Sequence, residues 1–249
     1  CFVQIPAVLS SFQPKAILLV LGEKSFRSSE YYPRLKQMLS PYLVVESSPV
    51  PQNPSQEFIQ EEIGRLQAQT YDLVLAVGGG STLDVSKILA VIPKQKKAEL
   101  NFYLNGSFPF ENEQVPLVAC PKTAGTGREV TPYASLETKD KRKITLSHQS
   151  FYPSVALVDP ELCHSMPAYV SASTGFDALS QAIESFWSIQ ATPFSRTHAL
   201  RALNLIVESL NKAVHERANT SARFDMSFAS CEAGLAIAQT KTTVVHSVS

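Results

Sequence analysis

The chain has 249 residues, 44% of them hydrophobic and 18% charged, so it can bury a substantial core as one large or two modest domains. Its 22 Lys and Arg residues balance 22 Asp and Glu residues, so no overall field attracts nucleic acid or an anionic membrane. No apolar run has the length of a transmembrane helix, and no secretory signal opens the chain. We therefore expect neither a nucleic-acid nor a membrane partner.

The four cysteines are scattered through the sequence with no paired spacing, at Cys1, Cys120, Cys163 and Cys231. Such a distribution is typical of reduced thiols rather than of a disulfide framework or a metal cluster. We therefore expect a cytoplasmic protein. A first residue other than Met suggests that the native start is missing.

Strand and helix patterns alternate in the first two thirds of the chain. Apolar runs predict strands at residues 15–21, 43–46, 71–77, 115–119, 141–147 and 154–158. Helical periodicity lies between them, with apolar positions at Tyr31, Leu35 and Leu39, over residues 55–67, and from Ser81 onward. Residues 105–113 are predicted to be a loop. Strands separated by helices indicate a parallel sheet that is covered on both faces.

Strand patterns stop after Asp159-Pro160, and three helical patterns follow at residues 169–188, 193–214 and 224–239. Met166-Pro167 precedes the first of these helices, which places a domain boundary near Pro167. The predicted fold is an α/β, Rossmann-like parallel-sheet domain over residues 1–167. An all-helical domain over residues 168–249 follows it, and we expect this domain to be incomplete.

A glycine-rich turn, Gly78-Gly79-Gly80, separates the predicted strand at 71–77 from a helix that begins at Ser81. Glycine adopts positive φ and lets a ligand approach the backbone without a Cβ in the way. The first N–H groups of the helix have no intrahelical partners and carry its positive dipole end, so they suit a phosphate. Ser81, Asp84 and Lys87 share one helical face. The alternative is a strand–turn–helix corner that binds nothing.

A second loop, residues 120–129, follows the apolar run at 115–119 and contains Thr123, Gly125, Thr126 and Gly127. Hydroxyls and bare backbone N–H groups suit a ribose or a diphosphate, and the two glycines permit close approach. Ordinary turn chemistry is the alternative for this loop alone. Two such loops at the carboxyl ends of parallel strands favour a nucleotide site, because ligands of such sheets bind in that crevice.

Four motifs in order, GGGSTLDVSK, PKTAGTGRE, ALVDPEL and TGFDALSQAIESFWS, resemble the iron-containing, or group III, alcohol dehydrogenases. The resemblance extends from about Lys15 to Ser249. Within that family, residues 177–187 and 241–247 are most similar to phosphonoacetaldehyde reductases. The family resemblance implies an NADP- or NAD-dependent oxidoreductase that acts on a small aldehyde or primary alcohol and forms a homo-oligomer.

Asp177 and Gln181 are four residues apart and so lie on one helical face, and His246 comes much later. Carboxylate oxygen, amide oxygen and imidazole nitrogen together can hold a divalent metal and leave a position open for substrate. The resemblance implies that these three residues bind Fe2+ or Zn2+, with a fourth ligand beyond Ser249. Gln181 stands where the family usually has His, which puts metal affinity and identity in question.

Without the family pattern, the same residues have simpler readings. Thr174 and Asp177 have the spacing of a helix cap, and His246 alone is more typical of a surface or satisfied core histidine. His148, His164, His198 and His215 also favour a structural role, as does Glu184.

The resemblance also implies cofactor contacts at eight positions. Gly79, Gly80 and Ser81 are expected to hold the pyrophosphate, and Thr123 and Thr126 the neighbouring phosphate or the nicotinamide ribose. The remaining expected contacts are Asn53, Asp84 and Lys143. The chemistry is expected where the helical half meets the glycine loops.

Two other functions remain open from the sequence. One is a same-fold lyase with bound nicotinamide, resembling dehydroquinate synthase, which a charged substrate pocket would favour. The other is a metal-free nucleotide-binding protein without catalysis. The only sequence feature that supports it is Gln181 at a position where the family usually has His. The G-x-S-x-G motif of serine hydrolases is absent.

The first prediction concerns cofactor choice. Gly22, directly after the first predicted strand, neither binds a ribose 2′-hydroxyl nor repels a 2′-phosphate, whereas Lys24 and Arg27 can attract that phosphate. We therefore expect NADP(H) to be used at least as well as NAD(H), although Glu23 is adjacent. The measurement is kcat/KM with each cofactor, and a clear preference for NAD(H) would contradict the prediction.

Overall fold

The computed structural model describes residues 2–111, 114–216 and 218–242. The chain divides into two compact units, which are described separately here. The α/β unit contains residues 1–120 and 132–157, and the helical unit contains residues 121–131 and 158–249. Across the described ranges, we find no helix with both the length and the apolarity needed to cross a membrane. The domain boundary near Pro167 remains a prediction.

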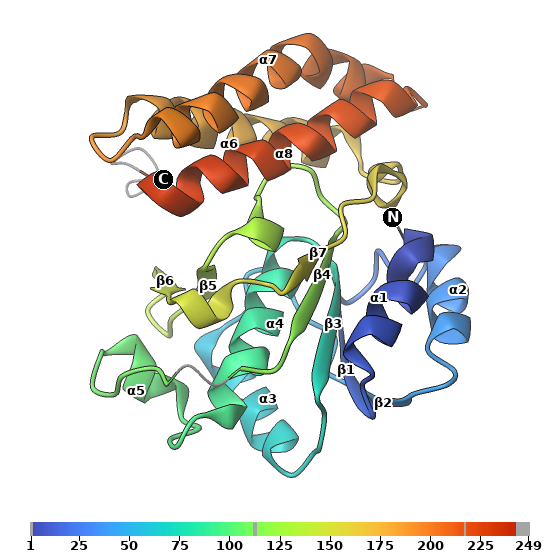
Figure 1. Cartoon of the computed structure of the whole chain (residues 1–249), viewed down its shortest axis with the longest axis vertical. Helices are drawn as coiled ribbons and strands as arrows, with labels where there is room; N and C mark the ends of the chain where they lie inside the picture. Colours follow the sequence, from blue (N-terminus) through green and yellow to red (C-terminus); the bar gives the residue numbers. More distant parts are fainter. Residues whose placement is uncertain (1, 112–113, 217, 243–249) are drawn as a thin grey trace. The chain divides into compact units, whose positions relative to one another are not determined.

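A five-stranded sheet with the order β2-β1-β3-β4-β7 forms the centre of the α/β unit (Figure 1). Strand β1 runs parallel to β2 and β3, and β4 runs parallel to β7. Every residue of β1 and β3 is buried, as expected for central strands covered on both faces. The strands are β1 Ala16–Leu21, β2 Leu43–Glu46, β3 Leu73–Gly78, β4 Leu117–Pro121 and β7 Val155–Ala156.

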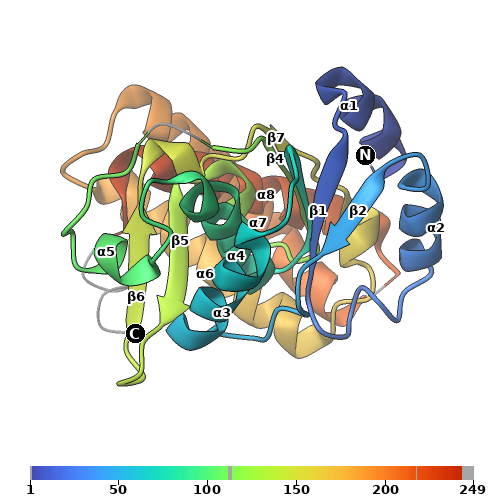
Figure 2. The same ribbon diagram turned by 90° about the horizontal axis from the view of Figure 1, so that it is seen from below.

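Helices cover both faces of this sheet, with α3 and α4 on one side and α1 and α2 on the other (Figures 1 and 2). Ser55 caps α3, because its Oγ accepts a hydrogen bond of 3.2 Å from the Phe58 N–H. Ile59 and Ile63 then pack against the sheet in the main core. The helices are α1 Ile5–Phe12, α2 Tyr31–Met38, α3 Gln56–Gln67, α4 Gly80–Val91 and α5 Leu100–Leu104.

Helix α4 is buried from Thr82 to Val91. The sheet packs on one side of this helix, and an antiparallel hairpin of β5 (Tyr133–Glu137) and β6 (Lys143–Ser147) packs on another. The Lys87 side chain is fully buried, and its Nζ donates a hydrogen bond of 2.8 Å to the Tyr133 carbonyl. This contact ties the hairpin to the middle of α4.

The helical unit consists of three long helices, α6 (Ala168–Trp187), α7 (Pro193–His215) and α8 (Thr220–Thr240), which pack against one another. Two short 3-10 helices, η3 (Arg128–Val130) and η5 (Pro160–Cys163), pack against α8. Buried alanines at the helix contacts, including Ala178, Ala202 and Ala233, let the helices approach closely.

The predicted fold class, a parallel-sheet α/β domain followed by helices, is confirmed. Element bounds differ by a few residues: β3 begins at Leu73 rather than residue 71, and β6 begins at Lys143 because Lys141 has a left-handed φ of 62°. Helix α8 begins four residues before its predicted start because Asn219 caps it through the Ala222 N–H. Strand β5 and helices α1 and α5 were not predicted.

Candidate functional site

The glycine turn joins β3 to α4. Gly78 ends the strand, Gly79 is the N-cap residue, and α4 begins at Gly80. Gly79, Gly80 and Ser81 are partly exposed, whereas the rest of α4 is buried. The turn therefore presents the free N–H groups and positive dipole end of a helix in a low-dielectric setting, which is the arrangement that binds phosphate groups well.

The physical role of the glycines differs from the expected one. Positive φ angles among described glycines occur at Gly106 and Gly127, so the turn does not use the left-handed region. Space is the constraint instead: a Cβ on Gly78 would lie 2.4 Å from Thr82 Oγ1. A Cβ on Gly22 would lie 3.2 Å from the same oxygen. Thr82 was not singled out from the sequence, because the contact depends on how closely the turn passes its own helix.

Asn53 lies beside this turn. Its backbone N–H donates a hydrogen bond of 3.2 Å to Ser81 Oγ. Its φ is 50°, in the left-handed region that asparagine tolerates better than most residues. The structure thus brings Asn53 and Ser81 together from positions 28 residues apart.

Lys143 lies at the start of β6 and is exposed. It pairs across the hairpin with Glu137, whose N–H donates a hydrogen bond of 2.9 Å to the Pro54 carbonyl. Since Pro54 follows Asn53, the hairpin end and the Asn53 segment are joined within the α/β unit.

Asp84 and Lys87 do not present a face to solvent together with Ser81. Asp84 is 4% exposed and Lys87 is fully buried, with its Nζ bonded to the Tyr133 carbonyl. The three residues share one face of α4, as their spacing predicts, but the β5–β6 hairpin covers this face at Lys87. A cofactor contact by Asp84 remains a prediction.

The residues proposed to choose between cofactors lie around the end of β1. Arg27 Nη1 lies 3.2 Å from Glu46 Oε2, and Lys36 Nζ lies 2.6 Å from Glu46 Oε1. Burial acts to raise the pKa of Glu46, but Lys36 and Arg27 outweigh it and hold this pKa below its ordinary value. Glu46 therefore stays ionised and offsets much of the Arg27 charge, which leaves Lys24, an exposed residue, as the freer cation.

The Thr-Gly loop, residues 121–131, belongs to the helical unit. Thr123 and Thr126 are partly exposed, while Gly125 and Gly127 are buried. Both glycines were expected to admit a ligand, but their missing side chains make room for helices α6 and α8. The hydroxyls are the groups that the loop leaves accessible.

Asp177 and Gln181 lie one turn apart on α6, as their spacing predicted. Gln181 is 5% exposed, and its Oε1 is buried with no hydrogen-bond partner among the described residues. A buried amide oxygen without a partner is costly, so it fits a position that a bound cation would satisfy. Asp177 is partly exposed.

The predicted third ligand, His246, lies outside the described residues. Among the residues that are described, no group of three or more His, Cys, Asp or Glu side chains is arranged to hold a metal ion. The capping alternative for Asp177 was wrong: α6 begins at Ala168, so Thr174 and Asp177 lie in its interior. Thr174 Oγ1 instead donates a hydrogen bond of 2.8 Å to the Val170 carbonyl.

Two other histidines have structural partners. His198 on α7 lies 2.5 Å from Glu232 Oε2 on α8, and Arg201 lies 3.2 Å from the other carboxylate oxygen. His148 accepts a hydrogen bond from the Ser150 N–H and stacks on Phe110, and burial lowers its pKa. Both agree with the structural role expected from the sequence, although the Glu232 partner of His198 lies 34 residues away and could not be predicted from local spacing.

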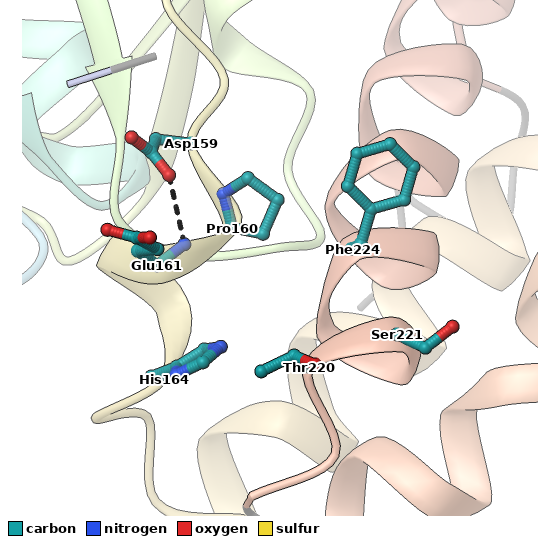
Figure 3. A pocket seen from close by; sticks show the side chains of 7 residues that line it. All are labelled: Asp159, Pro160, Glu161, His164, Thr220, Ser221 and Phe224. Carbon is teal, nitrogen blue, oxygen red and sulfur yellow. Dashed lines mark hydrogen bonds between the residues drawn. The ribbon is translucent and has the colours of Figure 1, made fainter. Parts of the chain in front are cut away.

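A groove of 430 Å³ lies between η5 and the start of α8 in the helical unit (Figure 3). Asp159 accepts a hydrogen bond of 3.1 Å from the Glu161 N–H and so caps η5. His164 points toward Thr220 across the groove (Figure 3). The groove is lined by none of the residues that the sequence predicts to bind cofactor or metal.

The glycine turn, the Thr-Gly loop and the α6 pair agree with two family comparisons. The family model described as "Iron-containing alcohol dehydrogenase" matches residues 1–160, and the model "Fe-containing alcohol dehydrogenase family, C-terminal" matches residues 171–249. The chain belongs to the iron-containing alcohol dehydrogenase family. The resemblance inferred from the four motifs is thereby confirmed, as is the assignment to the oxidoreductases of this family.

Two of the curated relatives are named as an alcohol dehydrogenase and an aldehyde reductase. The chain is 38% identical to long-chain-alcohol dehydrogenase 1 of Geobacillus thermodenitrificans, over 72% of the chain and 45% of that protein. It is 31% identical to sulfoacetaldehyde reductase of Bilophila wadsworthia, over 78% of the chain and 50% of that protein. The chain spans about half the length of the curated relatives it matches.

Solved structures share its fold. An iron-containing alcohol dehydrogenase from Thermotoga maritima matches with a TM-score of 0.91 and 32% identity, over 99% of this chain and 67% of that one. Sulfoacetaldehyde reductase from Bifidobacterium kashiwanohense, solved in complex with NAD+, matches with a TM-score of 0.90 and 34% identity. That match covers 98% of this chain and 65% of the reductase.

A substitution at Gly79 tests whether the glycine turn serves cofactor binding or only the stability of the fold. Gly79→Val places a branched side chain at the partly exposed N-cap, where a pyrophosphate would approach the backbone. We expect cofactor affinity to fall by at least about tenfold, equivalent to about 1.4 kcal/mol, while the melting temperature changes little. Cofactor fluorescence titration and a thermal melt of the same variant measure both.

Gly78→Ala is the matched comparison, because its Cβ would meet Thr82 at 2.4 Å inside the fold. This variant should lose stability by about 1–3 kcal/mol. If Gly79→Val lost stability and kept cofactor affinity per folded molecule, the turn would be structural only.

Proposed function

We propose that this protein transfers a hydride reversibly between a nicotinamide cofactor and a small aldehyde or primary alcohol. The observation that carries the proposal is the partly exposed Gly79–Ser81 turn at the N-terminus of the buried helix α4. Family membership supports the reaction type, and the NAD+ complex of the Bifidobacterium kashiwanohense reductase supports the cofactor class.

In this proposal, Gly79, Gly80 and Ser81 hold the pyrophosphate through backbone N–H groups at the helix N-terminus. Ser81 Oγ is oriented by the Asn53 N–H, so its hydroxyl proton remains available to a ligand oxygen. Lys143, exposed at the start of β6, supplies positive charge near the Asn53 segment. Thr123 and Thr126 supply hydroxyls to the neighbouring phosphate or to the nicotinamide ribose.

The metal proposal rests on α6. Asp177 and Gln181 supply a carboxylate and an amide oxygen one helical turn apart, and His246 is proposed as a nitrogen ligand. When bound, the cofactor supplies the hydride, and a divalent metal polarises the substrate oxygen. The unpartnered Oε1 of Gln181 supports this role, because a cation would satisfy it.

The proposed substrates are small aldehydes that carry an acidic group, in addition to simple alcohols. Residues 177–187 and 241–247 resemble phosphonoacetaldehyde reductases, and two of the relatives are named sulfoacetaldehyde reductases. The test is NAD(P)H consumption by the whole protein against phosphonoacetaldehyde, sulfoacetaldehyde and short uncharged aldehydes, with and without a chelator. Absence of turnover with every aldehyde, in protein that contains metal, would overturn the proposed function.

Three variants test the metal site. Asp177→Ala and His246→Ala each remove a proposed ligand, so we expect metal affinity to fall by at least about tenfold, and aldehyde turnover with it. Gln181→His should keep or strengthen binding, since imidazole is a good ligand for Zn2+, Ni2+ and Fe2+. Metal content by mass spectrometry, cofactor affinity and turnover are measured for each variant.

Glu208→Ala, which removes an exposed carboxylate from α7, is the control and should change none of these quantities. Cofactor affinity should remain close to that of the unsubstituted protein in all variants, because the metal ligands are not cofactor ligands. Normal turnover in Asp177→Ala would show that the reaction does not need the proposed metal.

A further inference from the structure

Helices of the same unit occupy the space that side chains would take at the two glycines of the Thr-Gly loop. A Cβ on Gly125 would lie 2.3 Å from the Thr174 carbonyl oxygen on α6. A Cβ on Gly127 would lie 2.5 Å from the Cα of Gly234 on α8, and a Cβ on Gly234 would lie 2.8 Å from the Cα of Gly127. Loop and helix backbones are therefore in direct contact, at a distance that only glycine on both sides permits.

A hydrogen bond reinforces this contact. The Gly127 N–H donates to Ser230 Oγ at 3.3 Å, and Ser230 is 2% exposed. Gly127 has a φ of 58°, so the chain turns through the left-handed region where it meets α8. Three features, the hydrogen bond, the φ angle and the facing glycines, thus fix the loop at one point.

The start of the loop is held separately. Lys122 is 6% exposed, and its Nζ donates a hydrogen bond of 3.3 Å to Ser165 Oγ. Burial lowers the pKa of Lys122. Between the two anchors, the side chains of Thr123 and Thr126 remain partly exposed.

We infer that Gly127, Ser230 and Gly234 are positioning residues, which hold the Thr-Gly loop on α8 so that the hydroxyls of Thr123 and Thr126 are presented to the nicotinamide cofactor. The inference rests on the proposed function. A loop fixed before binding loses less conformational entropy when its hydroxyls engage a ligand, so its anchors contribute to cofactor affinity without touching the cofactor.

Ser230→Ala is the mildest test. It removes the acceptor of the Gly127 N–H and leaves a buried donor without a partner. In the whole protein loaded with metal, we expect the Kd for NADH and NADPH to rise about three- to tenfold, with metal content unchanged. Ser227→Ala is the matched control, because Ser227 is also a buried serine of α8, with its Oγ bonded to the Arg223 carbonyl of the same helix.

Gly234→Ala tests the close contact. Its Cβ would meet Gly127 Cα and O, which are backbone atoms, so the loop must shift. We expect the Kd for both cofactors to rise about tenfold or more. Gly175→Ala is the control in α6: the atoms nearest to its Cβ would be the ends of the Leu210 and Met226 side chains, which can move, so cofactor affinity should change far less.

The outcomes separate the two claims. If the unsubstituted protein binds neither NADH nor NADPH, the proposed function fails. If it binds them and folded Ser230→Ala and Gly234→Ala bind them equally well, only the positioning role fails. Because both substitutions can lower the melting temperature in either case, metal content is decisive: a purely structural role would lower metal content and cofactor affinity together, and that result would also contradict the inference.

Discussion

The burial of helix α4 is the constraint on which the rest of the α/β unit depends. From Thr82 to Val91 the helix is enclosed by the sheet and the β5–β6 hairpin, and even Lys87 is fully buried with its Nζ on the Tyr133 carbonyl. Such a helix leaves only its first residues accessible. Its dipole and free N–H groups are thus directed at the partly exposed turn Gly79–Ser81, which makes that turn a strong candidate for binding an anion.

Glycine serves two different purposes in the candidate site. At Gly78 it provides space for the Thr82 side chain, which lets the turn pass close to its own helix. At Gly127 and Gly234 it lets a loop and a helix touch backbone to backbone. In both places a nearby hydroxyl group remains accessible, that of Ser81 in the first case and that of Thr126 in the second.

Local chemistry explains what could be predicted from the sequence. The helix over residues 55–67, the buried strands and the glycine turn each depend on residues a few positions apart, and all three were predicted. Gly127 N–H and Ser230 Oγ are 103 residues apart, so no local pattern could reveal that the loop glycines pack on α8. Burial of Lys87 likewise depends on a hairpin 46 residues away, and the unpartnered Gln181 Oε1 depends on the packing around α6.

The most direct test of the account is the fate of the hydride. The whole protein is incubated with NADH or NADPH that carries deuterium at C4 of the nicotinamide, on either face, together with an accepted aldehyde, and the alcohol is analysed by NMR. The account predicts deuterium on the carbinol carbon of the product from one of the two faces and none from the other. Aldehyde consumption without deuterium in the alcohol from either face would contradict hydride transfer as the reaction of this protein.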